Sequence, residues 1–229
     1  MKVADRGGHS PNCTGANGII KEQPSVREVV SRLNVVLKEY GHTIIDCNSN
    51  ASTVSGELNE GTKKANANNA DIYIPFHMNA SNGNGHGVEC LVYNSSSKKA
   101  IEIGTRMCAN LATLGLQNRG IKYRPELHDL KQTTMQAVIV ELLFCDNKHD
   151  VDIWNKTSWD TLVYLIANAI DPNIPKEKPI SQPIPPTQGQ QTFYRVVAGS
   201  YSNRTNAEKQ KALLESKGIT GVFLEAIKK

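Results

Sequence analysis

Apolar residues follow two different spacings along residues 1–172 of this chain. Short apolar runs, which are typical of buried strands, alternate with segments in which apolar residues recur every three or four positions, as on one face of a helix. The helical spacing is clearest from Val26 to Tyr40, and Gly41 stands where that helix should end. Strands are predicted at residues 1–5, 42–47, 71–81, 88–93 and 137–147, and further helices at 57–70, 98–115 and 150–170. This alternation predicts an α/β fold with a mostly parallel central sheet of about six strands and helices on both faces.

The composition changes after this alternating region. Residues 172–191 hold six of the ten prolines and few residues to bury, which predicts an extended linker. Residues 192–229 have the pattern of strand, helix and strand, a small α+β module too short to bury an ordinary core alone. The predicted organisation is therefore a domain at 1–172, a proline-rich linker at 173–191 and a small module at 192–229.

The composition also narrows the function classes. The chain is 39% hydrophobic and 21% charged, as in ordinary globular proteins, and it has no apolar run of the roughly 20 residues that a membrane span needs. The net charge of +4 is too weak to indicate nucleic-acid binding, but it favours an anionic partner such as a cell-wall polymer. The five cysteines include no C-x-x-C pair, so neither a disulfide framework nor a thiolate zinc site is expected. No apolar leader follows Met1, so we expect a protein made in the cytoplasm without a signal peptide, which acts on the cell wall after the membrane is opened.

Four polar residues stand where predicted strands end or where the first helix begins. His9 follows the first strand, His77 lies near the end of the third, Glu141 interrupts the most apolar strand, and Glu22 precedes the first helical pattern. Plainer explanations exist: a turn residue for His9, a core histidine for His77 and a structural carboxylate for Glu141. Together the four match a catalytic zinc site, which takes three nitrogen or oxygen ligands and keeps a fourth position open. In that interpretation His9, Glu22 and His77 are the ligands, and Glu141 is the separate general base.

The same residues lie in four motifs that resemble those of the zinc-dependent N-acetylmuramoyl-L-alanine amidases of the Amidase_3 type. The motifs are GGH at His9, a Glu22 that precedes a helix ending at a glycine, PFHMNAS at His77, and VELLFCDN at Glu141. The resemblance covers about residues 1–170. It implies a Zn²⁺ cofactor held by His9, Glu22 and His77, with Glu141 as the catalytic residue. It also implies the substrate, bacterial peptidoglycan, and the bond that is cut, the amide between N-acetylmuramic acid and L-alanine.

The sequence departs from the family pattern in two loops. The segment that starts at Asp5 is one residue longer than the usual Asp-Pro-Gly-His, and Gln136 replaces a proline before the strand with the catalytic carboxylate. Glu28 competes with Glu22 for the role of metal ligand. We favour Glu22, because its interval to Gly41 fits the family and Glu28 falls within the helical pattern.

The last segment resembles the first half of a sporulation-related (SPOR) repeat, a family that binds the glycan strands of peptidoglycan. Only one strand–helix–strand half is visible in residues 192–229. We therefore expect this module to bind the wall, to pack on the first domain, or to pair with a second copy in a homodimer.

A phage or prophage endolysin is the function that these features favour. The alternatives are a host amidase of the mother cell or spore, a zinc carboxypeptidase that uses Arg124 or Lys131, and a non-catalytic wall-binding protein with a structural metal. Glu141 counts against the last alternative, because a binding module has no use for a base in so apolar a strand.

Overall fold

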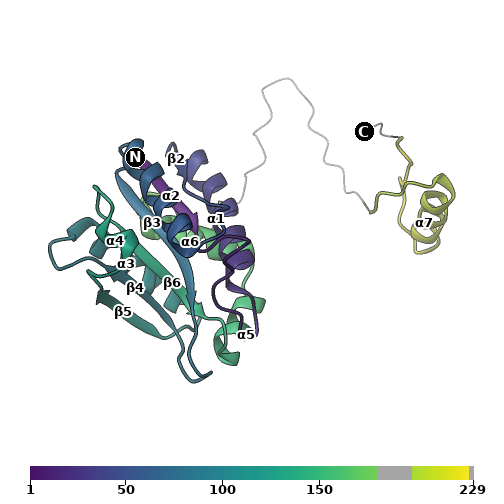
Figure 1. The fold of residues 1–229 in the computed structure, drawn as a ribbon. Coiled ribbons are helices and arrows are strands. Elements are labelled where there is room, and N and C mark those ends of the chain that lie inside the picture. Colours follow the sequence, from purple (N-terminus) through teal and green to yellow (C-terminus); the bar gives the residue numbers. More distant parts are fainter. Residues whose placement is uncertain (180–197, 227–229) are drawn as a thin grey trace. The chain divides into compact units, whose positions relative to one another are not determined.

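The computed structural model describes residues 1–179 and 198–226 of the chain (Figure 1). The chain divides into two units, Met1–Ile180 and Ser181–Lys229, which are described separately. No helix among the described residues is long and apolar enough to cross a membrane.

The described part of the first unit contains a six-stranded sheet in the order β2-β1-β3-β6-β4-β5. The strands are β1 (Lys2–Gly7), β2 (Thr43–Asp46), β3 (Ile72–Asn79), β4 (Val88–Val92), β5 (Asn118–Tyr123) and β6 (Val138–Phe144). Neighbouring strands are parallel, except that β4 runs antiparallel to β6. The predicted α/β class and mostly parallel sheet are therefore confirmed. The strand without an individual prediction is β5, an edge strand with no fully buried residue and thus no clear apolar alternation.

Helices cover both faces of this sheet (Figure 1). They are α1 (Glu22–Glu39), α2 (Val54–Ala67), α3 (Lys98–Ala112), α4 (His128–Lys131), α5 (Lys148–Lys156) and α6 (Trp159–Ile170). The helices α1, α3 and α6 share the larger core, which includes Leu33, Met107 and Ile166. The helices α2 and α4 cover the opposite face over a smaller core that includes Ala65 and Leu130. Two covered faces explain why the central strands read as nearly continuous apolar runs.

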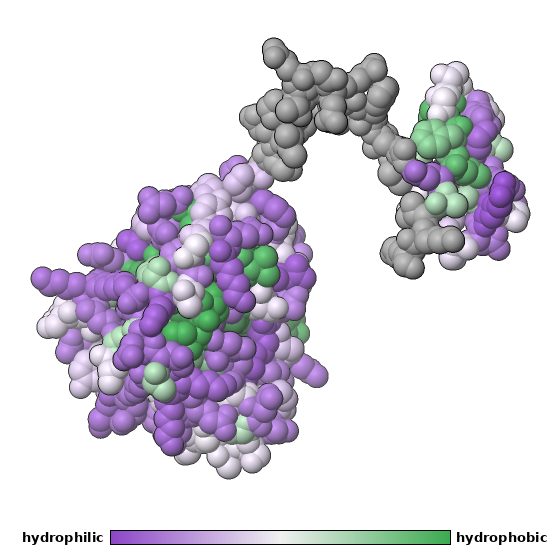
Figure 2. Space-filling model, turned by 90° about the horizontal axis from the view of Figure 1, so that it is seen from above, coloured by the Kyte–Doolittle hydropathy of each residue, from purple (hydrophilic) through white to green (hydrophobic). Residues whose placement is uncertain are grey.

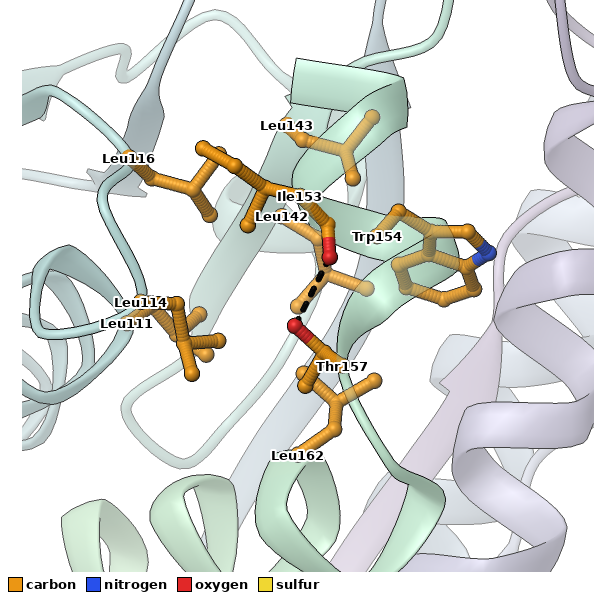
Figure 3. Close-up of a pocket in the computed structure, with 9 residues that line it drawn as sticks. All are labelled: Leu111, Leu114, Leu116, Leu142, Leu143, Ile153, Trp154, Thr157 and Leu162. Atoms are coloured by element: carbon orange, nitrogen blue, oxygen red, sulfur yellow. Dashed lines mark hydrogen bonds between the residues drawn. The ribbon is translucent and has the colours of Figure 1, made fainter. Parts of the chain in front are cut away.

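The prediction of one helix over residues 150–170 is wrong, because two helices take its place. Thr157 has an extended backbone, and the Ser158 side chain accepts a hydrogen bond from the Thr161 amide, which caps the start of α6. Figure 3 shows this corner, where the Thr157 hydroxyl donates to the Ile153 carbonyl at 2.8 Å. The apolar pocket beside it has a volume of about 10 Å³, room for one water at most, so we assign it no ligand.

The first helix begins earlier than its apolar pattern. Helix α1 starts at Glu22, and Pro24 is tolerated there because first-turn amides have no partner within a helix. The helix ends just before Gly41, as predicted, and the φ of +80° at Gly41 is a conformation that glycine adopts without strain. The early start places the Glu22 side chain in the first turn, within reach of the end of β3.

The second unit contains α7 (Arg204–Ser216), as the sequence pattern predicts. The first predicted strand of this unit lies largely outside the described residues. Residues 219–226 form no strand, contrary to the prediction, and no strand that could pair with them lies within 198–226. Leu213, Ile219 and Leu224 are exposed, and Figure 2 shows apolar surface in green beside hydrophilic surface in purple on this unit.

Candidate metal centre and catalytic carboxylate

The candidate residues meet at the carboxyl ends of three neighbouring strands. In the sheet, β3 lies between β1 and β6, so the ends of these strands share one edge. His9 follows β1, and His77 in β3 stands beside Glu141 in the parallel pairing with β6. Glu22 approaches the same edge from the first turn of α1. Sites in parallel sheets form at this edge, which is the physical reason that strand-end residues were informative.

Two histidines and one glutamate form a compact cluster. The Oε1 atom of Glu22 lies 2.9 Å from Nδ1 of His77 and 3.2 Å from Nε2 of His9. The two imidazole rings stand nearly perpendicular, with their centroids 4.9 Å apart. One ligand atom from each residue fits within a mutual separation of 4.8 Å. The structure thus brings together the three residues that the sequence analysis proposed as ligands.

The Glu22 carboxylate is buried, and both of its oxygens accept hydrogen bonds. Its Oε2 accepts a hydrogen bond from the Ala16 amide at 2.8 Å, and its Oε1 accepts another from the Met78 amide at 3.1 Å. Burial alone would raise the pKa of Glu22, but the hydrogen bonds and charges of His77 and His9 outweigh it and lower the pKa. Glu22 is therefore held as an anion, the form that binds a cation.

The backbone conformation at His9 and two nearby glycines leave space for the imidazole rings of the cluster. His9 has a φ of 66°, which is uncommon outside glycine, and the Arg27 guanidinium donates to its carbonyl at 2.6 Å. A Cβ at Gly8 would lie 2.2 Å from the His77 ring, and a Cβ at Gly15 would lie 2.3 Å from the His9 ring. Only glycine fits at either position without displacing a histidine.

Glu141 lies at the wall of a cleft of about 180 Å³, which it shares with His77 and apolar residues such as Leu58 and Leu127. Its Oε2 atom is buried and has no hydrogen-bond partner among the described residues. Burial, followed by the negative charges of Glu22 and Glu89, raises the pKa of Glu141 to about 8. An unpartnered, proton-retaining carboxyl beside a candidate metal cluster is suited to proton transfer.

Glu89 is a carboxylate that the sequence analysis did not single out. It stands opposite Glu141 in the pairing of β4 with β6. The Asn79 side-chain amide donates to its Oε1 at 2.9 Å, and the Arg119 guanidinium donates to its Oε2 at 2.7 Å. The signal that could have found it is the one used for Glu141, a lone carboxylate in an apolar strand.

Glu57 is a second residue that the sequence analysis missed. It lies in the first turn of α2, is 1% exposed, and has its Oε1 atom 3.5 Å from Nδ1 of His9. Burial raises the pKa of Glu57, and the positive charge of Arg6 and the neighbouring His9 oppose that shift. The polar, weakly periodic sequence of α2 carries no signal for this contact.

The competing candidates lie elsewhere. Glu28 is half-exposed and pairs with Arg32 at 2.6 Å, so it is not part of the cluster. Arg124 is exposed and pairs with Glu126, and neither it nor the exposed Lys131 lines the cleft in the part of the chain that the structure describes. The donors that do converge are two imidazoles and one carboxylate, a set that could hold a metal ion.

Comparisons with known proteins point the same way. The family model Amidase_3, described as N-acetylmuramoyl-L-alanine amidase, matches residues 3–172, and a SPOR domain model matches residues 176–225. The solved structure titled as the catalytic domain of the CD27L endolysin targeting Clostridia Difficile superposes with a TM-score of 0.67 and 32% identity. That match covers 74% of this chain and 96% of the other.

Two curated relatives are similar in sequence. An uncharacterized protein of Clostridium perfringens (strain 13 / Type A) is 35% identical over 195 residues, which cover 83% of this chain and 56% of the relative. An endolysin of Bacillus phage SPP1 is 31% identical over 160 residues, which cover 66% of this chain and 58% of the relative. The chain thus spans little more than half the length of these two relatives. With the family model matching nearly the whole first unit, the chain belongs to the Amidase_3 family of N-acetylmuramoyl-L-alanine amidases.

Proposed function

We propose that this protein is a peptidoglycan hydrolase that cleaves the amide bond between N-acetylmuramic acid and L-alanine. The observation that carries the proposal is the convergence of His9, Glu22 and His77 within 4.8 Å, beside Glu141, whose Oε2 atom has no hydrogen-bond partner among the described residues. Membership of the amidase family supports the choice of bond.

We further propose that the three clustered residues hold zinc. Two neutral imidazoles and an anionic carboxylate form a donor set that zinc favours, and the Ala16 and Met78 amides, which donate to the Glu22 oxygens, favour the ionised carboxylate. The glycines at positions 8 and 15 leave the space that the two imidazole rings occupy. A zinc ion in such a site supplies Lewis acidity toward a carbonyl oxygen and acidifies water.

The role of Glu141 follows from its surroundings. Its Oε2 atom has no other hydrogen bond to break among the described residues, so it is free to accept a proton from the attacking water. A divalent cation at the neighbouring cluster favours the ionised, proton-accepting form of this carboxylate. The proton is then passed from Glu141 to the nitrogen of L-alanine as the amide bond breaks, which leaves a free amine and a carboxylic acid that loses its own proton to water.

Digestion of purified cell walls tests the proposal. We expect new free α-amino groups on L-alanine, no new sugar reducing ends, and a loss of both digestion and bound zinc after chelation that added zinc reverses. Release of amino acids from the peptide end would instead indicate a carboxypeptidase. Wall binding without any new chain end would indicate a non-catalytic protein with a structural metal.

An endolysin role is the physiological setting that we propose, with a host wall amidase of the mother cell or spore as the alternative. Similarity to a phage endolysin in sequence and to an endolysin catalytic domain in structure supports it. The test is to produce the protein inside a susceptible bacterium and then to add an agent that opens the membrane. Rapid lysis that begins only after the agent is added supports the endolysin role, and viable cells after permeabilisation contradict it.

For the second unit we propose binding to the glycan strands of peptidoglycan, which the match to a SPOR domain model supports. We propose the organisation that the sequence predicts, a catalytic domain at 1–172, a linker at 173–191 and a wall-binding module at 192–229, except that the start of the linker packs on the domain. Ile174 is fully buried in the main core, and its carbonyl accepts a hydrogen bond from Asn168 at 2.6 Å. A truncation should therefore retain residues through 179.

Co-sedimentation with intact walls compares the full chain with residues 1–179. We expect the truncated protein to be found less in the pellet and to keep its activity on small soluble fragments. Equal sedimentation of the two proteins would overturn the wall-binding role. Light scattering of the same pair tests the predicted homodimer, which requires the full chain alone to have twice the monomer mass.

A further inference from the structure

Glu57 and Glu22 face opposite sides of one imidazole ring. Nε2 of His9 lies 3.2 Å from Glu22, which belongs to the candidate metal cluster. Nδ1 of the same ring lies 3.5 Å from Oε1 of Glu57 on α2. The two ring nitrogens therefore have two different carboxylate neighbours, supplied by two different helices.

This arrangement decides which nitrogen can bind a metal. A neutral imidazole carries its proton on one nitrogen and offers a lone pair on the other. A carboxylate next to Nδ1 favours the tautomer with the proton on Nδ1, which leaves the lone pair on Nε2, toward Glu22 and His77. The 3.5 Å separation is an ion-pair distance, and a carboxylate that accepts a hydrogen bond from Nδ1–H of a metal-bound histidine fixes the rotation of the ring and makes the other nitrogen a better donor.

The Glu57 carboxylate has no evident competing task. It does not cap α2, because the Thr53 side chain accepts the capping hydrogen bond from Gly56. Its Oε2 atom is buried and lacks a hydrogen-bond partner among the described residues. The guanidinium of Arg6, the positive charge nearest in effect to Glu57, is itself hydrogen-bonded to Asp129 at 2.8 Å.

We propose that Glu57 is a positioning residue for the metal site, which holds Nδ1–H of His9 so that Nε2 points toward the metal. The inference rests on the proposed zinc site and adds a residue to it. The proposal also assigns a role at the site to α2, a helix that contributes few residues to either core.

Zinc affinity of the full-length protein tests the inference, measured by competition with a coloured chelator. Glu57→Gln keeps the shape but removes the negative charge, and Glu57→Leu removes the acceptor. The matched control is Glu60→Gln, one turn further along α2, where an exposed glutamate bonds the Ser49 hydroxyl. We expect zinc affinity to fall about 10- to 100-fold in both Glu57 variants, as for other partners of metal-bound histidines, and to stay unchanged in the control.

Two further measurements separate positioning from structural support. The melting temperature of the metal-free Glu57→Gln protein should not fall, because the substitution removes a buried charge without changing the packing. The visible spectrum of the Co²⁺-loaded variants should change relative to the parent, because the donor strength and orientation of His9 change.

The outcomes are distinct. If the unaltered protein binds no zinc, the proposed metal site fails whatever Glu57 does. If the unaltered protein binds zinc and the Glu57 variants bind it equally well, the positioning role is overturned and the metal site stands. A loss of zinc as complete as in a ligand variant would make Glu57 a ligand and overturn the positioning role as well. Should Glu57→Leu fail to fold, the isosteric Glu57→Gln protein decides the question.

Discussion

Two neighbouring regions at the carboxyl end of the sheet shift the pKa of a carboxyl group in opposite directions. In the histidine cluster, Glu22 receives hydrogen bonds on both oxygens, and its pKa is lowered. In the cleft region, Glu141 has one oxygen without a hydrogen-bond partner among the described residues, and its pKa is raised to about 8. Glu22 is more deeply buried than the half-buried Glu141 and yet has the lower pKa, so burial alone does not decide their charge.

The difference shows how one fold assigns two roles to the same functional group. Histidine and amide donors around Glu22 favour the anion, which suits a metal ligand. Burial and the charges of Glu22 and Glu89 around Glu141 favour the protonated form, which suits a residue that exchanges protons. Pairs of carboxyls with divergent pKa values are a common basis for acid–base assignments in enzymes.

Removal of one of the three proposed ligands should abolish zinc binding in the histidine cluster. His77→Ala leaves two ligands, so we expect zinc to be lost and activity to fall by at least about 10⁴-fold, since a catalytic metal contributes several kcal/mol. Metal analysis and wall digestion measure the two effects. His149→Ala, which changes a histidine with a 65% exposed side chain, is the control and should keep both zinc and activity. A His77→Ala protein with full zinc content would remove His77 from the metal site.

Substitution in the second region should separate metal binding from catalysis. Glu141→Gln is expected to keep zinc and to lose about 10²- to 10⁴-fold in activity, the usual contribution of a general base. The same two measurements apply, with Glu28→Gln as the control, a half-exposed glutamate outside the cluster. Near-normal turnover in Glu141→Gln would show that this carboxyl is structural.

A methyl group placed beside the cluster should weaken metal binding without removing a ligand. Gly8→Ala puts a Cβ 2.2 Å from the His77 ring, so the ring must move, and zinc affinity should fall about tenfold or more. Gly41→Ala is the control, because its φ of +80° makes the change strained far from the site. The control should lower stability and leave zinc affinity intact; equal affinities in all three proteins would contradict the steric argument.

The smallest expected effect is on the stability of the metal-free protein as pH changes. Glu141 has a folded-state pKa of about 8 against an ordinary value of 4.5, so the folded state holds this proton over a range in which the unfolded state has lost it. The free energy of unfolding should therefore fall as pH rises from 5 to 9, and Asp5, with a pKa also raised to about 8, acts in the same direction.

Glu141→Gln removes the contribution of Glu141 to this decline. The quantity to compare is the free energy of unfolding of the variant minus that of the parent. We expect this difference to be larger at pH 9 than at pH 5 by more than about 1.4 kcal/mol, the equivalent of one pKa unit. Chemical denaturation of chelated protein at both pH values gives the difference. An equal effect of the substitution at pH 5 and pH 9 would mean that the Glu141 pKa is not raised.

Much of the fold could be predicted because its signals are local. The apolar spacing from Val26 onward predicted α1, and the continuous apolar run around Glu141 predicted the covered strand β6. The break at Thr157 was missed, because the apolar spacing continues from α5 into α6 and only the cap at Ser158 interrupts it. Edge strand β5 was missed for a related reason, since a strand with little burial has no apolar alternation.

By itself, the sequence placed His9 after the first strand, His77 near the end of the third and Glu141 within the most apolar one, because strand and turn patterns depend on neighbouring residues. Tertiary structure decided the rest. The sequence favoured Glu22 over Glu28 as a ligand, but the packing of α1 against the sheet was needed to bring Glu22 beside the histidines. Only the approach of α2 brought Glu57 to His9. The opposite pKa shifts of Glu22 and Glu141 also arise there, because they depend on charges and hydrogen bonds from residues that lie dozens of positions away in the chain and a few ångströms away in space.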